Sequence, residues 1–333
     1  MMQISPETQL FIREHSSDDV RVLALQAKKY PDIDMPTAIT QIAGRKVAAE
    51  KIPSWWEIEK IWYPKHLSLE QCSSEITARY KARLLQGDSL TDLTGGFGID
   101  CSFLATGFKS ATYVERQEEL CEIAAHNFPV LNLNHINIKN EDGVTYLQAM
   151  SPVDCLFLDP ARRNEHGGKT VAISDCEPNV AELEELLLQK ANRVMIKLSP
   201  MLDLSLALKE LKQTQEVHIL SVNNECKELL ILLGQTSPTE ISIHCVNLST
   251  KGTQEEQHFV FTREQEQCSE CTYTDSLETY LYEPNASLLK AGAFRSIAAA
   301  YPVRKLHPNS HLYTSDTFIE NFPGRIFRIV NQC

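Results

Sequence analysis

The 333-residue chain lacks several features that would place it in a specialised class of protein. It has no run approaching the ~20 consecutive apolar residues with which a helix spans a bilayer. Its N-terminal segment is polar and acidic, unlike a secretory signal. The sequence also contains no internal repeat and no low-complexity segment. These absences favour a globular protein of the cytoplasm that has no membrane partner.

An excess of basic residues is missing as well. The net charge is −12, which argues against broad non-specific binding to nucleic acid but leaves room for a local basic face. The ten cysteines are scattered, and several lie in apolar runs, which is typical of buried, reduced thiols. Only Cys268 and Cys271 have the spacing of metal ligands, and no second pair accompanies them. We therefore expect no metal site.

Periodicity divides the chain into three parts. Residues 1–65 have apolar positions at helical spacing, which predicts an N-terminal helical domain. Over residues 66–235 predicted strands and helices alternate, which indicates a doubly wound, Rossmann-like α/β domain with a mostly parallel sheet. Residues 236–333 differ in composition and predict a small α+β region, whose end we expect to be truncated or completed by another element.

The α/β domain is expected to hold a seven-stranded sheet. The strands are predicted at 89–94, 111–115, 135–138, 153–158, 193–197, 216–222 and 228–234. Only a short turn separates the last two strands, so they should form an antiparallel hairpin at the edge of the sheet.

The most informative segment is residues 90–100, LTDLTGGFGID. A short apolar run ends in Asp92, and a glycine-rich turn then leads into a helix. Glycines allow the backbone of such a turn to approach a ligand closely. A dinucleotide fingerprint that begins at Gly96 would need a glycine at position 101, where the chain has Cys101. The turn therefore favours S-adenosylmethionine (SAM), which has no pyrophosphate, over NAD. The cofactor-binding residues predicted here are Asp92, Thr94, Gly95, Gly96, Phe97 and Gly98.

Four acids follow successive predicted strands: Asp92, Glu115, Asp142 and Asp159. Ligands of open α/β sheets bind at the carboxyl ends of the strands. In such a site Glu115 would accept hydrogen bonds from ribose hydroxyls, Asp142 would meet the adenine amino group, and Asp159 would lie beside the methyl donor. Each acid taken singly could instead be a helix N-cap. Their ordered occurrence favours a cofactor site.

These residues resemble the class I SAM-dependent methyltransferases over about residues 66–234. The segments 69–81 (LEQCSSEITARYK) and 159–163 (DPARR), with the tail motifs YEPN (282–285), KAG (290–292) and LHPN (306–309), resemble a bacterial group with a C-terminal THUMP-like domain. The resemblance implies SAM as the cofactor. THUMP-type modules further imply RNA, either rRNA or tRNA, as the substrate and partner.

The residues after Asp159 bear on the acceptor atom. Enzymes that methylate amino groups typically carry Asn/Asp-Pro-Pro-aromatic at this place. The acid and the carbonyl of Pro160 are present here, whereas the second proline and the aromatic residue are not. Uracil-C5 methyltransferases with Asp-Pro-Ala-Arg need a cysteine nucleophile after the next strand, where this chain has KLSP (197–200). The residues therefore disfavour C5 chemistry and leave a base amino nitrogen open.

A ribose 2′-oxygen is the other acceptor left open. Asp159, Lys197 and Glu228, with Lys81 as a fourth member, follow the order of the Lys-Asp-Lys-Glu tetrad of 2′-O-methyltransferases. A lysine between two acids can activate a hydroxyl, although Lys197 could simply form an ion pair with Asp159.

Basic residues near the predicted site point to its substrate. Arg162 and Arg163 would suit contacts to RNA phosphates, and a solvated basic turn is the alternative. Three functions are therefore weighed: an RNA methyltransferase, a methyltransferase of a small molecule or protein, and a non-catalytic subunit that binds SAM and RNA. The oligomeric state stays open.

Overall fold

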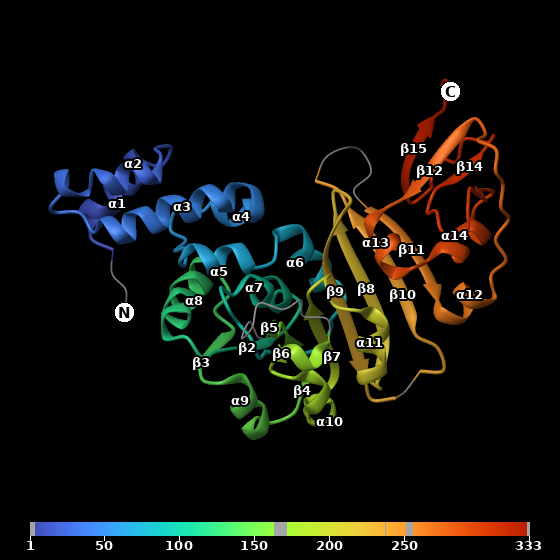
Figure 1. Cartoon of the computed structure of the whole chain (residues 1–333). Helices are drawn as coiled ribbons and strands as arrows, with labels where there is room; N and C mark the ends of the chain where they lie inside the picture. Colours follow the sequence, from blue (N-terminus) through green and yellow to red (C-terminus); the bar gives the residue numbers. More distant parts are fainter. Residues whose placement is uncertain (1–3, 163–171, 237, 251–255, 332–333) are drawn as a thin grey trace. The chain divides into compact units, whose positions relative to one another are not determined.

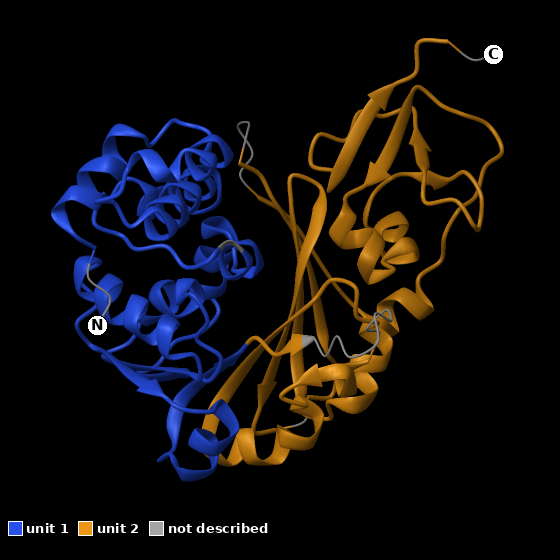
Figure 2. Ribbon diagram, turned by 60° about the vertical axis from the view of Figure 1, so that its left-hand side comes forward, with its two compact units in different colours: residues 1–158 blue, residues 159–333 orange. Residues whose placement is uncertain are grey.

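The computed structural model describes residues 4–162, 172–236, 238–250 and 256–331. The chain divides into two compact units, Met1–Leu158 and Asp159–Cys333, which Figure 2 colours separately. Within the described part of the chain, no helix is both long enough and apolar enough to cross a membrane.

A nine-stranded sheet is the central element of the fold (Figure 1). Its strands are β1 (Ser89–Asp92), β2 (Ser110–Glu115), β3 (Ile136–Asn140), β4 (Val153–Leu158), β7 (Ala191–Leu198), β8 (Thr214–Val222), β9 (Glu225–Gly234), β10 (Ser242–Leu248) and β11 (Glu256–Thr262). They lie in the order β11-β10-β8-β9-β7-β4-β1-β2-β3. The predicted α/β class with a mostly parallel sheet is confirmed, and the seven predicted strands correspond to β1–β4 and β7–β9.

The predicted edge of the sheet was wrong. Strands β8 and β9 form the expected antiparallel hairpin, but β10 pairs in parallel with β8, and β11 pairs antiparallel with β10. Two strands that the sequence assigned to the C-terminal region thus extend the main sheet. The reason is that the hairpin leaves an edge of unpaired N–H and C=O groups on β8, which the next strands along the chain satisfy.

Nine α-helices belong to the described part of unit 1. They are α1 (Pro6–Glu14), α2 (Val20–Leu25), α3 (Met35–Lys51), α4 (Pro53–Trp56), α5 (His66–Gln71), α6 (Glu75–Ala82), α7 (Ile99–Ala105), α8 (Glu118–Val130) and α9 (Gly143–Ala149), with a 3₁₀ turn at Ala27–Lys29. Helices α1, α2 and α3 begin at capping residues, Ser5, Asp19 and Asp34, whose side chains accept hydrogen bonds from backbone N–H groups of the first turn. The predicted N-terminal helices are therefore confirmed.

These N-terminal helices share a core with the glycine turn. Ile52 and Trp55 pack in one buried cluster with Phe97 and Ile99. The rings of Trp55 and Phe97 meet edge to face, with centroids 5.2 Å apart. The turn is thereby fixed from the side of the N-terminal helices as well as from the sheet.

Unit 2 combines the remaining sheet strands with smaller elements. Its helices are α10 (Val180–Lys190), α11 (Leu204–Glu210), α12 (Arg263–Cys268), α13 (Ala286–Ala291) and α14 (Phe294–Ala300), with a 3₁₀ turn at Ile173–Asp175. Two short strands, β5 (Ala161–Arg162) and β6 (Cys176–Glu177), pair antiparallel. The predicted small α+β region contains a second, antiparallel sheet in the order β13-β14-β12-β15, formed by β12 (Tyr280–Pro284), β13 (Arg304–Lys305), β14 (Tyr313–Ser315) and β15 (Gly324–Arg328).

Candidate cofactor-binding and catalytic site

The glycine turn between β1 and α7 is held by backbone and side-chain hydrogen bonds. Asp92 ends β1, and its Oδ1 accepts from the N–H of Thr94 at 3.0 Å. The N–H of Gly95 donates to the carbonyl of Val114 at 2.8 Å, and the N–H of Gly98 donates to the carbonyl of Gly95 at 2.8 Å. The turn is thus tied to β2 and closed on itself.

Three glycines meet different constraints in this turn. Gly96 and Gly98 have φ values of +54° and +86°, the left-handed region that favours glycine. A Cβ on Gly95 would lie 2.2 Å from the ring of Tyr113, so the backbone packs directly on that ring. A Cβ on Gly96 would meet no atom closer than the Thr94 carbonyl oxygen at 3.8 Å. The backbone at Gly96 is therefore the part of the turn that a ligand can approach.

Glu115 ends β2 and contacts the same turn. Its Oε2 accepts from the N–H of Gly96 at 2.9 Å, and its Oε1 accepts from the N–H of Gln117 at 2.8 Å. The residue is buried, with 9% of its surface exposed. Because each carboxylate oxygen has two lone pairs, these bonds leave capacity for hydroxyl donors.

Asp142 follows β3 and caps α9. Its Oδ1 accepts from the N–H groups of Val144 at 3.1 Å and Thr145 at 3.0 Å. The start of α9 packs closely on the turn, since a Cβ on Gly143 would lie 2.2 Å from the carbonyl oxygen of Leu93. The capping role weighed for these acids is confirmed for Asp142, and its adenine contact stays a prediction.

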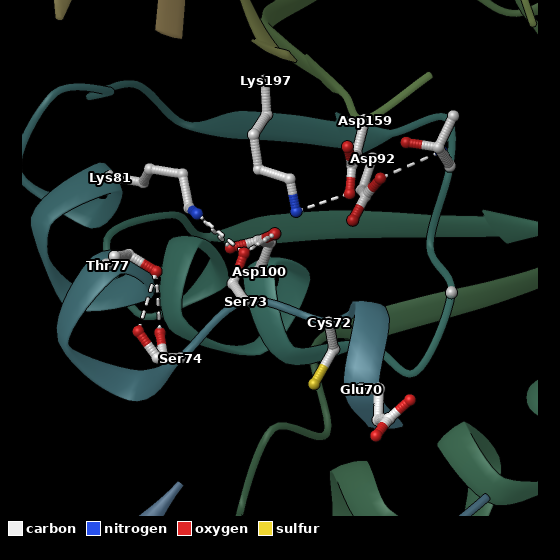
Figure 3. A network of polar contacts seen from close by, with 12 residues as sticks. Glu70, Cys72, Ser73, Ser74, Thr77, Lys81, Asp92, Asp100, Asp159 and Lys197 are labelled. Carbon is white, nitrogen blue, oxygen red and sulfur yellow. Dashed lines mark hydrogen bonds and ion pairs between the residues drawn. The ribbon is translucent and has the colours of Figure 1, made fainter. Parts of the chain in front are cut away.

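Two predicted site residues of unit 1 have buried side chains. The Phe97 side chain is 4% exposed and packs in the core against Trp55, so the cofactor contact predicted for Phe97 would have to come from its backbone. The Lys81 side chain is fully buried; its Nζ lies 2.9 Å from Oδ1 of Asp100 and donates to Oγ of Ser73 at 2.8 Å (Figure 3). This burial and pairing favour a structural role for Lys81, and its contact with substrate stays a prediction.

The predicted pair of Asp159 and Lys197 is present in unit 2 (Figure 3). Asp159 follows directly after β4, and Pro160 follows it. Nζ of Lys197 lies 2.5 Å from Oδ2 of Asp159. The Lys197 side chain is 9% exposed, whereas that of Asp159 is 36% exposed. The ammonium is therefore shielded, and part of the carboxylate faces outward.

Glu228 lies on the same face of the sheet as Lys197. Lys197 of β7 pairs with Leu230 of β9, and Glu228 precedes Leu230 by two positions. Residues two apart on a strand share a face. Counted over the whole residue, each of the two is 7% exposed, and both lie in otherwise apolar, buried stretches of their strands. All four predicted catalytic residues thus lie in unit 2: Asp159, Pro160, Lys197 and Glu228.

The predicted phosphate-binding arginines stay untested. Arg162 belongs to β5, where its backbone pairs with Cys176, and its side chain is outside the description. Arg163 lies outside the described residues.

The fold defines an α/β protein whose glycine turn follows the carboxyl end of a parallel strand, which is the place where ligands of open α/β sheets bind. A crystal structure described as a "putative methyltransferase from Porphyromonas gingivalis W83" matches at 35% identity and a TM-score of 0.86, covering 99% of this chain and 84% of that one. The chain belongs to the same family as this methyltransferase.

Other comparisons add detail. A ferredoxin-like domain family matches residues 280–323, so a ferredoxin-like domain lies within the C-terminal region, and a THUMP-like domain is not confirmed. An rRNA methylase from Streptococcus thermophilus matches at 14% identity and a TM-score of 0.35, covering 48% of this chain and 94% of that one. SMU.1697c from Streptococcus mutans, solved in complex with SAH, matches at 13% identity and a TM-score of 0.35, covering 49% and 97%. Likeness at this level carries no argument. No curated protein matches the chain.

Proposed function

We propose that this protein is a cytoplasmic SAM-dependent methyltransferase whose substrate is RNA, either rRNA or tRNA. The observation that carries the proposal is the glycine turn, with its approachable backbone at Gly96 beside the buried carboxylate of Glu115, in a chain of a methyltransferase family. Free thiols are present at Cys101, Cys121, Cys226, Cys245, Cys268 and Cys271, which suits a reducing compartment.

The residues of unit 1 fit SAM. The open side of Gly96 gives a small ligand room against the backbone, and Glu115 has lone pairs for two ribose hydroxyls. Asp142 is exposed and follows β3, and its carboxylate would contact the adenine amino group of bound SAM. When bound, SAM supplies an electrophilic methyl group on its sulfonium. The protein would supply the position of that methyl group and the groups that hold the acceptor.

The residues of unit 2 would act on the acceptor. Lys197 is held at one oxygen of Asp159 and orients the carboxylate. The exposed part of that carboxylate would accept a hydrogen bond from the acceptor's N–H or O–H, and the Pro160 carbonyl would accept a second. Lys81 is engaged with Asp100 and Ser73, which disfavours Lys81 as the fourth member of the lysine tetrad. This pairing favours a base amino nitrogen over a ribose 2′-oxygen.

RNA as the substrate is supported by the Arg162-Arg163 pair that follows Asp159-Pro160. A small molecule, a protein, or no methyl acceptor at all are the competing outcomes. All three can be separated in one assay.

The assay measures transfer of labelled methyl from SAM to total cellular RNA, to protein and to small metabolites by the full chain. Label in RNA is the expected result. Label found only in protein or metabolites would show that the substrate is a protein or a small molecule and not RNA. SAM binding without transfer to any fraction would indicate a non-catalytic subunit. Mass spectrometry of RNA nucleosides from cells lacking the protein then identifies the methylated atom.

A substitution of Lys197 tests the catalytic assignment. We expect Lys197→Ala to abolish transfer while calorimetric SAM binding is unchanged. Lys227→Ala is the matched control, because Lys227 lies on the neighbouring strand β9 in an exposed pair with Glu225. Loss of SAM binding by the Lys197 variant would make this lysine structural.

A further inference from the structure

A cluster of potential metal ligands lies on the sheet of unit 2, apart from Asp159 and Lys197. Glu216 and His218 on β8 and His244 on β10 each offer a ligand atom, and these three atoms lie within 4.8 Å of one another. His218 and His244 are direct neighbours in the parallel β8–β10 register, and Glu216 shares their face because it is two residues from His218. The two imidazole rings stack with centroids 4.3 Å apart.

A fourth side chain borders the cluster from β11. Nε2 of His258 lies 3.1 Å from Nδ1 of His244. A contact of this length requires a proton on one nitrogen and a lone pair on the other. His258 therefore adds another imidazole at the edge of the same face, where it is exposed.

The Glu216 carboxylate is held by contacts with His218 and Arg193. Its Oε2 lies 3.3 Å from Nε2 of His218, and its Oε1 lies 2.8 Å from Nη2 of Arg193. A carboxylate oxygen and imidazole nitrogens are donor atoms that divalent transition metals bind. Arg193 would orient the carboxylate from the outer shell.

We propose that Glu216, His218 and His244 bind a divalent transition-metal ion, with Zn²⁺ as the best fit. Two imidazoles and a carboxylate form a mixed nitrogen and oxygen set, which Zn²⁺ binds at about 2.0–2.2 Å in tetrahedral geometry. His258 or a water would complete the four ligands. Mg²⁺ and Ca²⁺ prefer oxygen ligands alone, so they fit this set poorly.

The ion would have a structural role. Its ligands come from β8 and β10, so it would fasten the strands that extend the sheet beyond the β8–β9 hairpin. This site is independent of the proposed methyl transfer, because none of its three ligands belongs to the glycine turn or to the Asp159–Lys197 pair. It also revises the expectation that the chain has no metal site.

The experiment titrates the metal-free full chain with Zn²⁺ alone, by calorimetry and by thermal unfolding. One ion per chain and a higher Tm are expected. Glu216→Gln keeps the shape of the side chain and should weaken Zn²⁺ binding at least tenfold, and His244→Ala should do so more strongly. His311→Ala is the control, because His311 stacks on Phe294 outside the cluster and should not affect binding.

Cobalt distinguishes this site from the cysteines. Co²⁺ bound by Glu216 and the histidines gives a visible d–d spectrum without a thiolate charge-transfer band. Such a band would assign the ion to thiols such as Cys268 and Cys271 and overturn the proposal. Zn²⁺ affinity that is equal in wild type, Glu216→Gln and His311→Ala would overturn it too, as would the absence of binding. Circular dichroism checks that each variant is folded. If His244→Ala does not fold, the comparison of wild type with Glu216→Gln alone tests the proposal.

Discussion

Replacing Lys81 by methionine should strongly destabilise unit 1. The Lys81 side chain is fully buried, Asp100 is 8% exposed, and Ser73 bridges them, donating to Asp100 at 2.7 Å. Removing one partner of a buried ion pair leaves an uncompensated charge, which costs about 3–5 kcal/mol. Because each 1.4 kcal/mol is about a factor of ten, the unfolding equilibrium constant should rise between roughly 10²-fold and roughly 4,000-fold. Asp100 is the second residue of α7, so SAM binding should weaken as well.

Tryptophan fluorescence in urea measures this effect, because the three tryptophans of the chain, Trp55, Trp56 and Trp62, all belong to unit 1. In the double variant Lys81→Met/Asp100→Leu both charges are gone, and most of the lost stability should return. The control is Lys109→Met, since Lys109 forms an exposed pair with Asp88 and should change nothing measurable. The reasoning fails if Lys81→Met behaves like this control, or if the double variant is as unstable as the sum of its single substitutions.

Three further predictions concern unit 1. Gly95→Ala puts a Cβ 2.2 Å from Tyr113, which should lower the free energy of unfolding by about 1–3 kcal/mol and weaken SAM binding. Gly107→Ala is the control, because its Cβ has no neighbour closer than 3.7 Å, and this variant should have the Tm of wild type. Asp142→Ala removes the cap of α9 and should cost about 1 kcal/mol in urea unfolding, most of which Asp142→Asn should restore; equal losses would contradict the cap. Hydrogen bonds from the N–H groups of Asp88 and Ser89 and from the Ser89 hydroxyl lower the pKa of Asp154 from its ordinary value of 3.8. Its carboxylate therefore stabilises the fold at neutral pH, and this contribution is lost as the pH falls below 3.8 and through the lowered pKa of the folded protein. The Tm difference between wild type and Asp154→Asn should therefore shrink in acid, and a constant difference would refute this.

Local patterns in the sequence determined the elements of the α/β sheet. The strand predicted at 153–158 has the observed bounds, because apolar periodicity and turn residues act over a few neighbouring positions. The acids at or just after the ends of β1 to β4 could also be predicted from the sequence, because the end of a strand depends on the residues of that strand and the turn that follows it. Family membership confirmed the methyltransferase class that these residues predicted.

Long-range pairing decided what the sequence could not. No local pattern shows that β10 joins β8, and only that register brings His244 beside His218, although 26 positions (244 − 218) separate them. The same holds for Lys81, whose partner Asp100 lies on another helix, and for Phe97, whose side chain packs on Trp55. The sequence by itself determined which residues can form strands, turns and acidic strand ends. Tertiary structure alone decided which charged side chains are buried together, because burial depends on contacts between distant segments.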